Sequence, residues 1–170
     1  MKKIIVSACL MGENCKYDGG NNYSEKLAMW LAERLAEGEL VSCIPVCPEM
    51  LGGLDAPRKP CEIVNGVVQT EDGTSCDEEF RHGAELAWQL ACDAGVDMEF
   101  DENEAGEDDA ADVTVRKEKP KLAILQSRSP SCGVGRIYDG TFSGNKTDGN
   151  GVFAQFLIDQ GVKVIDIAEL

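Results

Sequence analysis

IIVSAC, residues Ile4 to Cys9, is a continuous run of apolar and small residues that ends just before a glycine-containing loop. Such an uninterrupted run is typical of a strand buried on both faces of a parallel sheet. Between Asn22 and Gly38, apolar residues recur at helical spacing, and Leu40 to Val46 form a second apolar run. The order strand, helix, strand predicts a crossover between two parallel strands, with Ile4 to Cys9 as the first of them.

The rest of the chain continues this alternation. Asn22, with Glu25 three residues later, resembles a capping box, so we expect Asn22 to cap the first helix. An irregular Pro- and Gly-rich segment follows Cys47. The elements beyond it are expected in the order hairpin, helix, strand, hairpin, helix and strand, at residues 63–68, 76–94, 122–125, 138–141, 151–160 and 162–167. This pattern predicts one α/β domain over residues 1–170, with a compact Rossmann-like layered fold and a mostly parallel central sheet.

Composition and charge limit the possible settings. The chain has 170 residues, eight of them cysteine, and a formal net charge of −15. The apolar run near the start is too short to span a membrane and is not followed by a cleavage-site pattern, so we expect a cytoplasmic protein. In that reducing compartment, cysteines bind metals, catalyse or lie buried more often than they form disulfides. Eight carboxylates fall between Met98 and Asp112, and we expect a solvated acidic insertion over about residues 98–119.

Three cysteines stand where an apolar strand stops and a turn begins. They are Cys9, Cys47 and Cys132, which follow the first, second and third central strands. The carboxyl ends of parallel strands meet at the crevice where α/β proteins bind ligands. Three thiols converging there predict a metal or cluster site with one vacant position, because structural zinc sites and [4Fe–4S] clusters normally take four protein ligands. For any single cysteine, burial as an inert core thiol is the simpler reading.

Polar residues lie near these cysteines. Glu49 is two residues beyond Cys47, where a carboxylate in a dry site could act as a general acid or base, or could cap the next turn. Ser129 lies three residues before Cys132 and could bind substrate or water, or make a local turn bond. Arg58 could anchor an anionic group, but we expect it to pair with a carboxylate such as Glu62. The remaining side chains of interest are Cys43 and Cys92, expected to be inert; His82, given no role; and Cys15, Cys61 and Cys76, which the spacing leaves unassigned.

Three motifs, VSACLMGENCKYDGG, VCPEMLGGLDAPRKPCEI and SRSPSCGVGRIYDGTFSG, occur in this order. Together they resemble the thiouracil desulfurase (TudS-like) family, and the resemblance covers all but the acidic stretch. It implies a [4Fe–4S] cluster held by Cys9, Cys47 and Cys132, which leaves one iron open and could be lost on aerobic purification. It also implies Glu49 and Ser129 as the catalytic pair, while Cys15 is not implied as a ligand.

The resemblance further implies removal of sulfur from thiolated pyrimidines, such as thiouracil or 4-thiouridine species, with C=S becoming C=O. We expect the open iron to act as a Lewis acid, Glu49 to move the proton of an attacking water, and Ser129 to orient water or substrate. A non-catalytic iron–sulfur sensor or sulfide carrier is the alternative, in which Glu49 serves only structure. A thiol-redox or zinc protein would need a close cysteine pair or a fourth ligand, and the spacing offers neither.

The acidic composition bears on partners. Nucleic-acid affinity depends on Lys and Arg that neutralise phosphates, which a net charge of −15 opposes. We therefore expect a free thiolated base or mononucleotide as substrate, rather than bulk nucleic acid, and expect neither a membrane nor a protein partner to be required.

Overall fold

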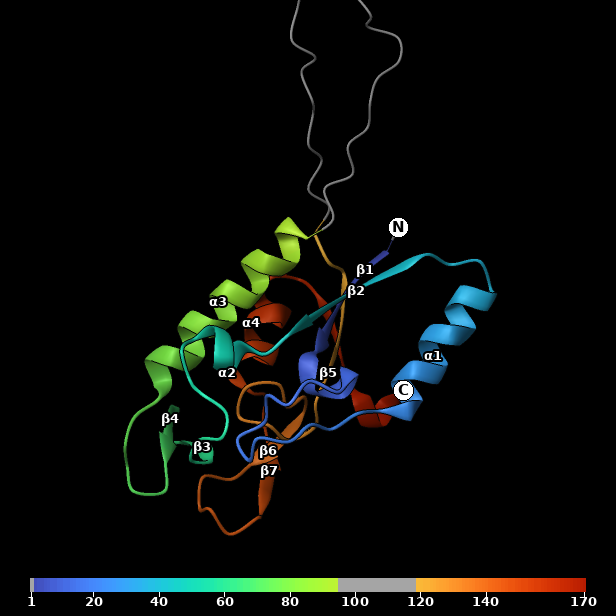
Figure 1. Ribbon diagram of the computed structural model, residues 1–170. Coiled ribbons are helices and arrows are strands. Elements are labelled where there is room, and N and C mark those ends of the chain that lie inside the picture. The colour runs from blue at the N-terminus through green and yellow to red at the C-terminus, as the bar shows by residue number, and fades with distance from the viewer. Residues whose placement is uncertain (1, 95–118) are drawn as a thin grey trace, which may run out of the picture.

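The central sheet has four strands, in the order β2 (Val41–Val46), β1 (Lys2–Ser7), β5 (Leu122–Leu125) and β8 (Lys163–Asp166) (Figure 1). This computed structural model describes residues 2–94 and 119–170. Each of the three ladders in the sheet is parallel. The predicted α/β fold with a mostly parallel sheet is confirmed, whereas the acidic segment expected at about 98–119 lies almost wholly outside the described residues.

The buried position of β1 explains its composition. Ile4, Ile5 and Val6 pair with β2 on one side and with β5 on the other. Ile5 and Val6 face opposite sides of the sheet, and both are completely buried. A strand that is covered on both faces has no place for alternating polar residues, which is why the sequence shows a continuous apolar run.

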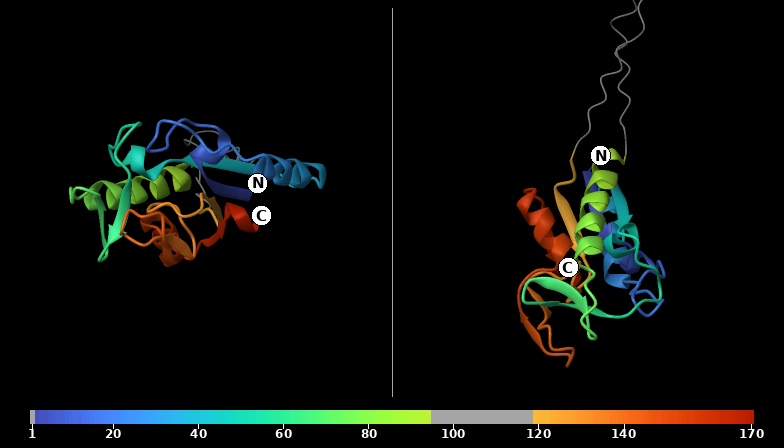
Figure 2. Two further views of the ribbon diagram at one scale, coloured as in Figure 1. Left: turned by 90° about the horizontal axis from the view of Figure 1, so that it is seen from below. Right: turned by 90° about the vertical axis from the view of Figure 1, so that its left-hand side faces the viewer.

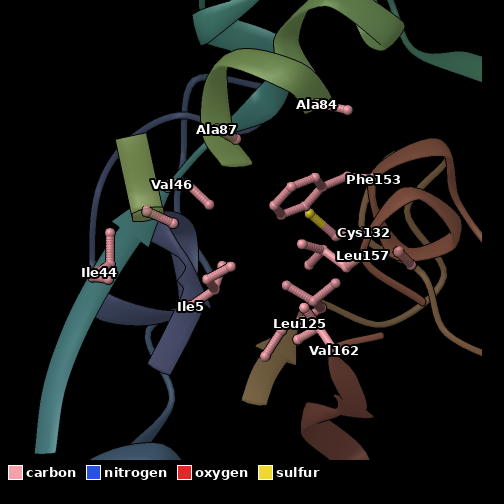
Figure 3. Close-up of a cluster of buried hydrophobic side chains, with 13 residues drawn as sticks. Ile5, Ile44, Val46, Ala84, Ala87, Leu125, Cys132, Phe153, Leu157 and Val162 are labelled. Carbon is pink, nitrogen blue, oxygen red and sulfur yellow. The ribbon is translucent and has the colours of Figure 1, made fainter. Parts of the chain in front are cut away.

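Helices cover both faces of the sheet. Helix α1 (Glu25–Ala36) packs Leu27 against Ile4, Val6 and Ile124 on one face. Helices α3 (Asp77–Asp93) and α4 (Val152–Asp159) lie together on the other face, as Figures 1 and 2 show. Their core there combines small α3 side chains with large α4 side chains (Figure 3): Ala84, Ala87, Ala91, Phe153 and Leu157.

The strand order indicates where a ligand-binding crevice should lie. The chain passes from β1 to β2 on one side, and later returns to put β5 on the other side of β1. In parallel sheets, the crevice beyond the carboxyl ends at such a reversal is where ligands bind. Two hairpins lie beyond this end of the sheet (Figure 1). They are β3 (Cys61–Val64) with β4 (Val67–Thr70), and β6 (Arg136–Tyr138) with β7 (Lys146–Asp148).

Two local predictions about the first crossover are wrong. Ser24, and not Asn22, caps α1: its hydroxyl accepts from the Leu27 N–H at 3.2 Å, while the Asn22 N–H donates to the Cys9 carbonyl. The strand expected to reach Cys9 ends at Ser7. A 3₁₀ turn, η1 (Ala8–Met11), follows it and contains Cys9.

Two further predictions need correction beyond β2. The segment after Cys47, expected to be irregular, begins with the short helix α2 (Pro48–Leu51), for which Pro48 supplies a pre-set first position. The second hairpin does not turn at residues 138–141. Its strands are joined by residues 139–145, because Glu62 of the first hairpin binds the Gly140 and Phe142 N–H groups of that loop.

Glycine allows α2 to lie directly on α3. A Cβ atom at Gly83 would stand 1.9 Å from the Pro48 carbonyl oxygen, and one at Gly52 would stand 1.9 Å from the Glu79 carbonyl oxygen. Neither position has room for a side chain. The backbone contact fixes the place of Glu49, which lies between Pro48 and Gly52.

Candidate active site

A cavity of about 500 Å³ opens at the carboxyl ends of β1, β2 and β5. The three predicted cysteines line it, from η1, from the junction of β2 with α2, and from the loop that follows β5. Glu49, Arg58 and Ser129 line it as well. The structure thus brings together side chains that are up to 123 positions apart in the chain (from Cys9 to Cys132).

Local backbone bonds position each cysteine. Cys9 is 7% exposed, and its carbonyl accepts from the N–H groups of Gly12 and Asn22. Gly12 has φ +96°, a left-handed conformation that favours glycine and ends the turn. Cys47 is the residue before the first turn of α2, so the helix that carries Glu49 also fixes this thiol.

The loop of Cys132 is held by the start of α4. The N–H groups of Val152 and Phe153 donate to the carbonyls of Pro130 and Ser131, at 2.9 Å each. These helix N–H groups would otherwise lack partners within α4. Cys132 itself is 6% exposed and lies beside Phe153 and Leu157 in the core (Figure 3). It therefore stands at the boundary between core and cavity.

Cys15 is a fourth thiol in the cavity wall. It is 4% exposed, and its carbonyl accepts from the Cys47 thiol at 3.7 Å. A hydrogen bond with Cys47 lowers the pKa of Cys15, but a hydrogen bond with Cys9 and burial outweigh it and raise the pKa to about 11. The sequence reading left Cys15 unassigned. Its place six residues after Cys9 in the same loop is the one available signal that it would share the site.

Cys47 and Cys132 are also held neutral. The hydrogen bond with Cys15 and burial raise the pKa of Cys47 far above its ordinary value. Burial raises the pKa of Cys132 to about 12, although a hydrogen bond with the Ser7 hydroxyl opposes the rise. Thiolate is the form that binds metals, so loading this site with iron must release protons.

Glu49 and Arg58 form an ion pair in the cavity wall. Both guanidinium nitrogens facing Glu49 reach the same carboxylate oxygen: Nε at 2.8 Å and an Nη at 2.6 Å. The side chains are 15% and 10% exposed. Burial raises the pKa of the Glu49 carboxyl, and the Arg58 charge opposes part of that rise. A carboxylate in such a site is suited to general acid–base work near neutral pH.

Arg58 also joins three segments of the wall. It donates to the carbonyls of Asp55 and Cys15 at 3.0 Å each, and its backbone N–H donates to the Tyr17 carbonyl at 2.7 Å. Arg58 forms the expected ion pair with a carboxylate, but its partner is Glu49 and not Glu62. Glu62 is 7% exposed and instead accepts from the N–H groups of Gly140 and Phe142. Arg58 is thus a residue that the sequence reading placed in a different pair.

Ser129 makes the local turn bonds that were its alternative role. Its hydroxyl oxygen accepts from the N–H groups of Ser131 and Cys132, at 3.0 and 3.1 Å. Both acceptor positions of the hydroxyl are then filled, and its O–H remains as a donor. Ser129 can therefore position Cys132 and donate into the cavity at the same time.

The side chains of the cavity fit one kind of metal centre better than another. Within residues 2–94 and 119–170, no three Cys, His, Asp or Glu side chains are grouped closely enough to hold one metal ion. A single zinc ion requires such a group, whereas thiolates around an iron–sulfur cluster are spread over its several irons. Five thiols line the cavity, those of Cys9, Cys15, Cys47, Cys61 and Cys132, and such a set fits a cluster.

Cys43, His82 and Cys92 lie away from the cavity. Cys43 is in β2 and packs on the α1 face, and Cys92 is near the end of α3. His82 is exposed on α3. Cys61 lines the cavity, and its sulfur lies 3.5 Å from that of Cys76. No disulfide joins any of the eight cysteines, all of which lie in the described ranges. No helix in the described ranges is long and apolar enough to cross a membrane.

Comparison with known proteins gives one consistent result. The family described as 2-thiouracil desulfurase matches residues 4–169. An uncharacterized protein of Bacillus subtilis (strain 168), YbbK, is 36% identical over 177 residues, which span 98% of this chain and 97% of that protein. A solved structure described as the [4Fe-4S]-dependent thiouracil desulfidase TudS is 35% identical with a TM-score of 0.75, covering all of this chain and 93% of that one. The chain belongs to the 2-thiouracil desulfurase family.

Proposed function

We propose that this protein is a desulfidase that converts a thiolated pyrimidine, thiouracil or a 4-thiouridine-type base or nucleotide, into its oxygen counterpart and hydrogen sulfide. The reaction balances as thiocarbonyl plus water giving carbonyl plus hydrogen sulfide, so no net electron transfer is needed. The observation that carries the proposal is that Cys9, Cys47 and Cys132 line one cavity with Glu49 and Ser129. The family and the [4Fe-4S]-dependent relative at 35% identity support the same chemistry.

Cys9, Cys47 and Cys132 would hold a [4Fe–4S] cluster, each after losing its thiol proton. When bound, the cluster supplies an iron Lewis acid that polarises the thiocarbonyl of the substrate. Cys15 and Cys61 are the other thiols of the wall and are not needed in this ligand set.

Glu49 takes the proton of the water that attacks the ring carbon. Its raised pKa, caused by burial, makes it a stronger base than an exposed carboxylate. Arg58 holds the Glu49 carboxylate in one orientation through its two contacts to a single Glu49 oxygen.

Ser129 donates its O–H to the ring or to the attacking water. Two backbone N–H groups donate to the Ser129 hydroxyl oxygen and hold the hydroxyl in place. Its O–H therefore remains available as a donor. A planar ring entering the cavity would meet the aromatic side chains of Tyr17, Tyr138 and Phe142, which line it. Phe142 is held there by the bond from its N–H to Glu62.

Anaerobic reconstitution followed by turnover of 2-thiouracil and 4-thiouridine, with sulfide detection, tests the proposal. The wild type should bind about four irons and release sulfide in amounts equal to the oxygenated product. Cys132→Ser should lose the cluster, as judged by iron and sulfide content and by its electronic spectrum. Cys43→Ser, outside the cavity, should retain both cluster and turnover. A wild-type protein that takes up no iron would refute the cluster.

Glu49→Gln separates the enzyme from a non-catalytic sensor or sulfide carrier. We expect a loss of turnover of about 10²–10⁴-fold with an unchanged cluster, because the amide keeps the shape but cannot take a proton. Ser129→Ala should lower turnover by at least about tenfold, because it removes the donor and leaves two N–H groups without their acceptor. Full turnover by Glu49→Gln would exclude the catalytic role.

A further inference from the structure

Cys61 and Cys76 form a second thiol site, separate from the three proposed cluster ligands and Cys15. Their sulfur atoms are 3.5 Å apart, and both thiols are free. Cys61 is the first residue of β3, and Cys76 directly precedes α3. We propose that this pair is a reversible redox site, which a low-molecular-weight disulfide converts into an intramolecular disulfide.

The backbone already holds the two residues face to face. The Cys76 N–H donates to the Val68 carbonyl at 2.9 Å, and the Val68 N–H donates to Asp77 at 3.1 Å. Cys61 packs against the cluster formed by Val68, Cys76 and Phe80. A disulfide requires sulfurs at about 2.0 Å, so each needs to move by less than an ångström.

Access and burial assign different roles to the two thiols. Cys61 is half-buried and lines the active-site cavity, whereas Cys76 is 9% exposed. A small disulfide entering from the cavity therefore meets Cys61 first. Burial and the hydrogen bond with Cys76 raise the pKa of Cys61 to about 12, so Cys61 reacts through its small deprotonated fraction. This thiolate attacks the small disulfide, forms a mixed disulfide and releases one small thiol. Cys76 then attacks the Cys61 sulfur and releases the second small thiol. The protein loses two protons and two electrons, and the small disulfide takes them up as two thiols.

The position of Cys61 links this reaction to the cavity. Arg58, three residues before it, holds Glu49, and Glu62, the next residue, holds the loop of Gly140 and Phe142. Cys61 lies between Arg58 and Glu62 in the chain. Closure of the disulfide would therefore join this segment covalently to Cys76, at the start of α3. Two walls of the cavity would then be fixed by one covalent bond, so the redox state of the pair should set the rigidity of the site.

Peptide mapping tests the proposal without depending on turnover, so its failure is distinguishable from failure of the proposed function. Cluster-loaded protein is equilibrated anaerobically at increasing ratios of glutathione disulfide to glutathione, quenched with acid, alkylated and cleaved with trypsin. Residues 59–81 form one peptide that contains Cys61 and Cys76 and no other cysteine. We expect this peptide to lose both alkyl groups, to become lighter than the dithiol by two hydrogens, and to regain both thiols with dithiothreitol.

Variants separate the pair from other thiols. Cys61→Ser and Cys76→Ser should each abolish the internal disulfide, while Cys92→Ser, with the same number of thiols, should behave as wild type. Full alkylation of residues 59–81 at every ratio, or a disulfide from Cys61 to another peptide, would overturn the proposal. The oxidised wild type should also melt about 5–10 °C higher than the reduced protein, with slower amide exchange in β3 and β4. An unchanged melting temperature would overturn the rigidifying effect.

Discussion

Arg58 shows how one side chain can organise a site without touching a substrate. Its guanidinium group binds the carboxylate of Glu49 and the carbonyls of Asp55 and Cys15. These contacts use the planar fork of an arginine, which presents several donors in fixed directions. Because the pair is largely buried, neither charge can be lost without leaving the other unpaired.

We predict that Arg58→Lys lowers turnover by about 10–100-fold while the cluster content stays unchanged. Lysine keeps the charge but has one ammonium group, which cannot hold Glu49 and two carbonyls together. Initial-rate measurements and iron analysis of the reconstituted variant provide the check. Lys59→Arg, at an exposed neighbouring position, is the matched control. A variant with normal turnover would show that Glu49 does not depend on this contact.

At the residue scale, sequence reasoning succeeded where a motif marked the position. It placed Cys9, Cys47, Cys132, Glu49 and Ser129, and the structure brings all five to one cavity; their chemical roles stay predictions. It named the wrong partner for Arg58, because Glu62 is four positions away along the chain and Glu49, the actual partner, is nine. Which of them is the partner depends on the loop of residues 139–145, and no local pattern encodes that.

At the scale of elements, the contact between α2 and α3 determines where Glu49 lies. A helix of four residues has little stability of its own, because the first turn must be fixed before it gains hydrogen bonds. The close backbone approach at Gly52 and Gly83 provides the support. The sequence reading treated residues 48–62 as irregular, since a single helical turn has no periodicity to detect.

We predict that Gly83→Ala destabilises the protein by about 1–3 kcal/mol, despite the better helix propensity of alanine. Its Cβ would stand 1.9 Å from the Pro48 carbonyl oxygen, so α2 must shift away from α3. Urea unfolding measures the loss, and turnover should fall with it because Glu49 moves. Glu85→Ala, on the exposed side of the same helix, should change stability by less than about 0.5 kcal/mol. Equal stability of Gly83→Ala and the wild type would disprove the tight contact.

The larger elements were predictable because each has its own signal. The apolar run of β1, the period of α1 and the Asn-Gly turn of the first hairpin each specify a local structure. The boundaries of these elements were less predictable. Asn22 and Ser24 are both good caps, but α1 begins at Glu25 and Ser24 caps it, while the Asn22 N–H bonds to the Cys9 carbonyl. The sequence predicted the second hairpin but not the extent of its loop, because Glu62 of the distant strand β3 fixes that loop.

At the scale of the whole molecule, charge restricts what can approach the cavity. The formal net charge of −15 repels a polyanion, while a small substrate interacts mainly with the cavity itself. The cavity wall contains Lys16, Arg58 and Arg128 among acidic residues, so it is locally less negative than the chain as a whole.

We predict that bulk tRNA does not inhibit desulfuration of a free thiopyrimidine at physiological salt, even at micromolar concentration. Competition assays with unmodified tRNA measure this directly, and a thiolated mononucleotide serves as the positive competitor. Inhibition by tRNA that weakens steeply with added salt would reveal a basic surface that the net charge conceals.

We also predict that removing iron with a chelator under anaerobic conditions leaves the fold intact. The two buried clusters on the faces of the sheet are made of apolar side chains and do not require a metal. Far-ultraviolet circular dichroism should be unchanged, and the thiols should become available to alkylation. Loss of helical signal on chelation would show that the metal supports the fold, as it does in zinc fingers.

The strand order β2-β1-β5 has a consequence for how the protein matures. The three proposed ligands come from segments that meet only after β5 has paired with β1, and Cys132 emerges from the ribosome long after Cys9 and Cys47. A partial chain can offer only two of the three thiols. Cluster delivery must therefore follow synthesis and folding, and a cell would accumulate finished but unloaded protein whenever its supply of clusters falls behind translation.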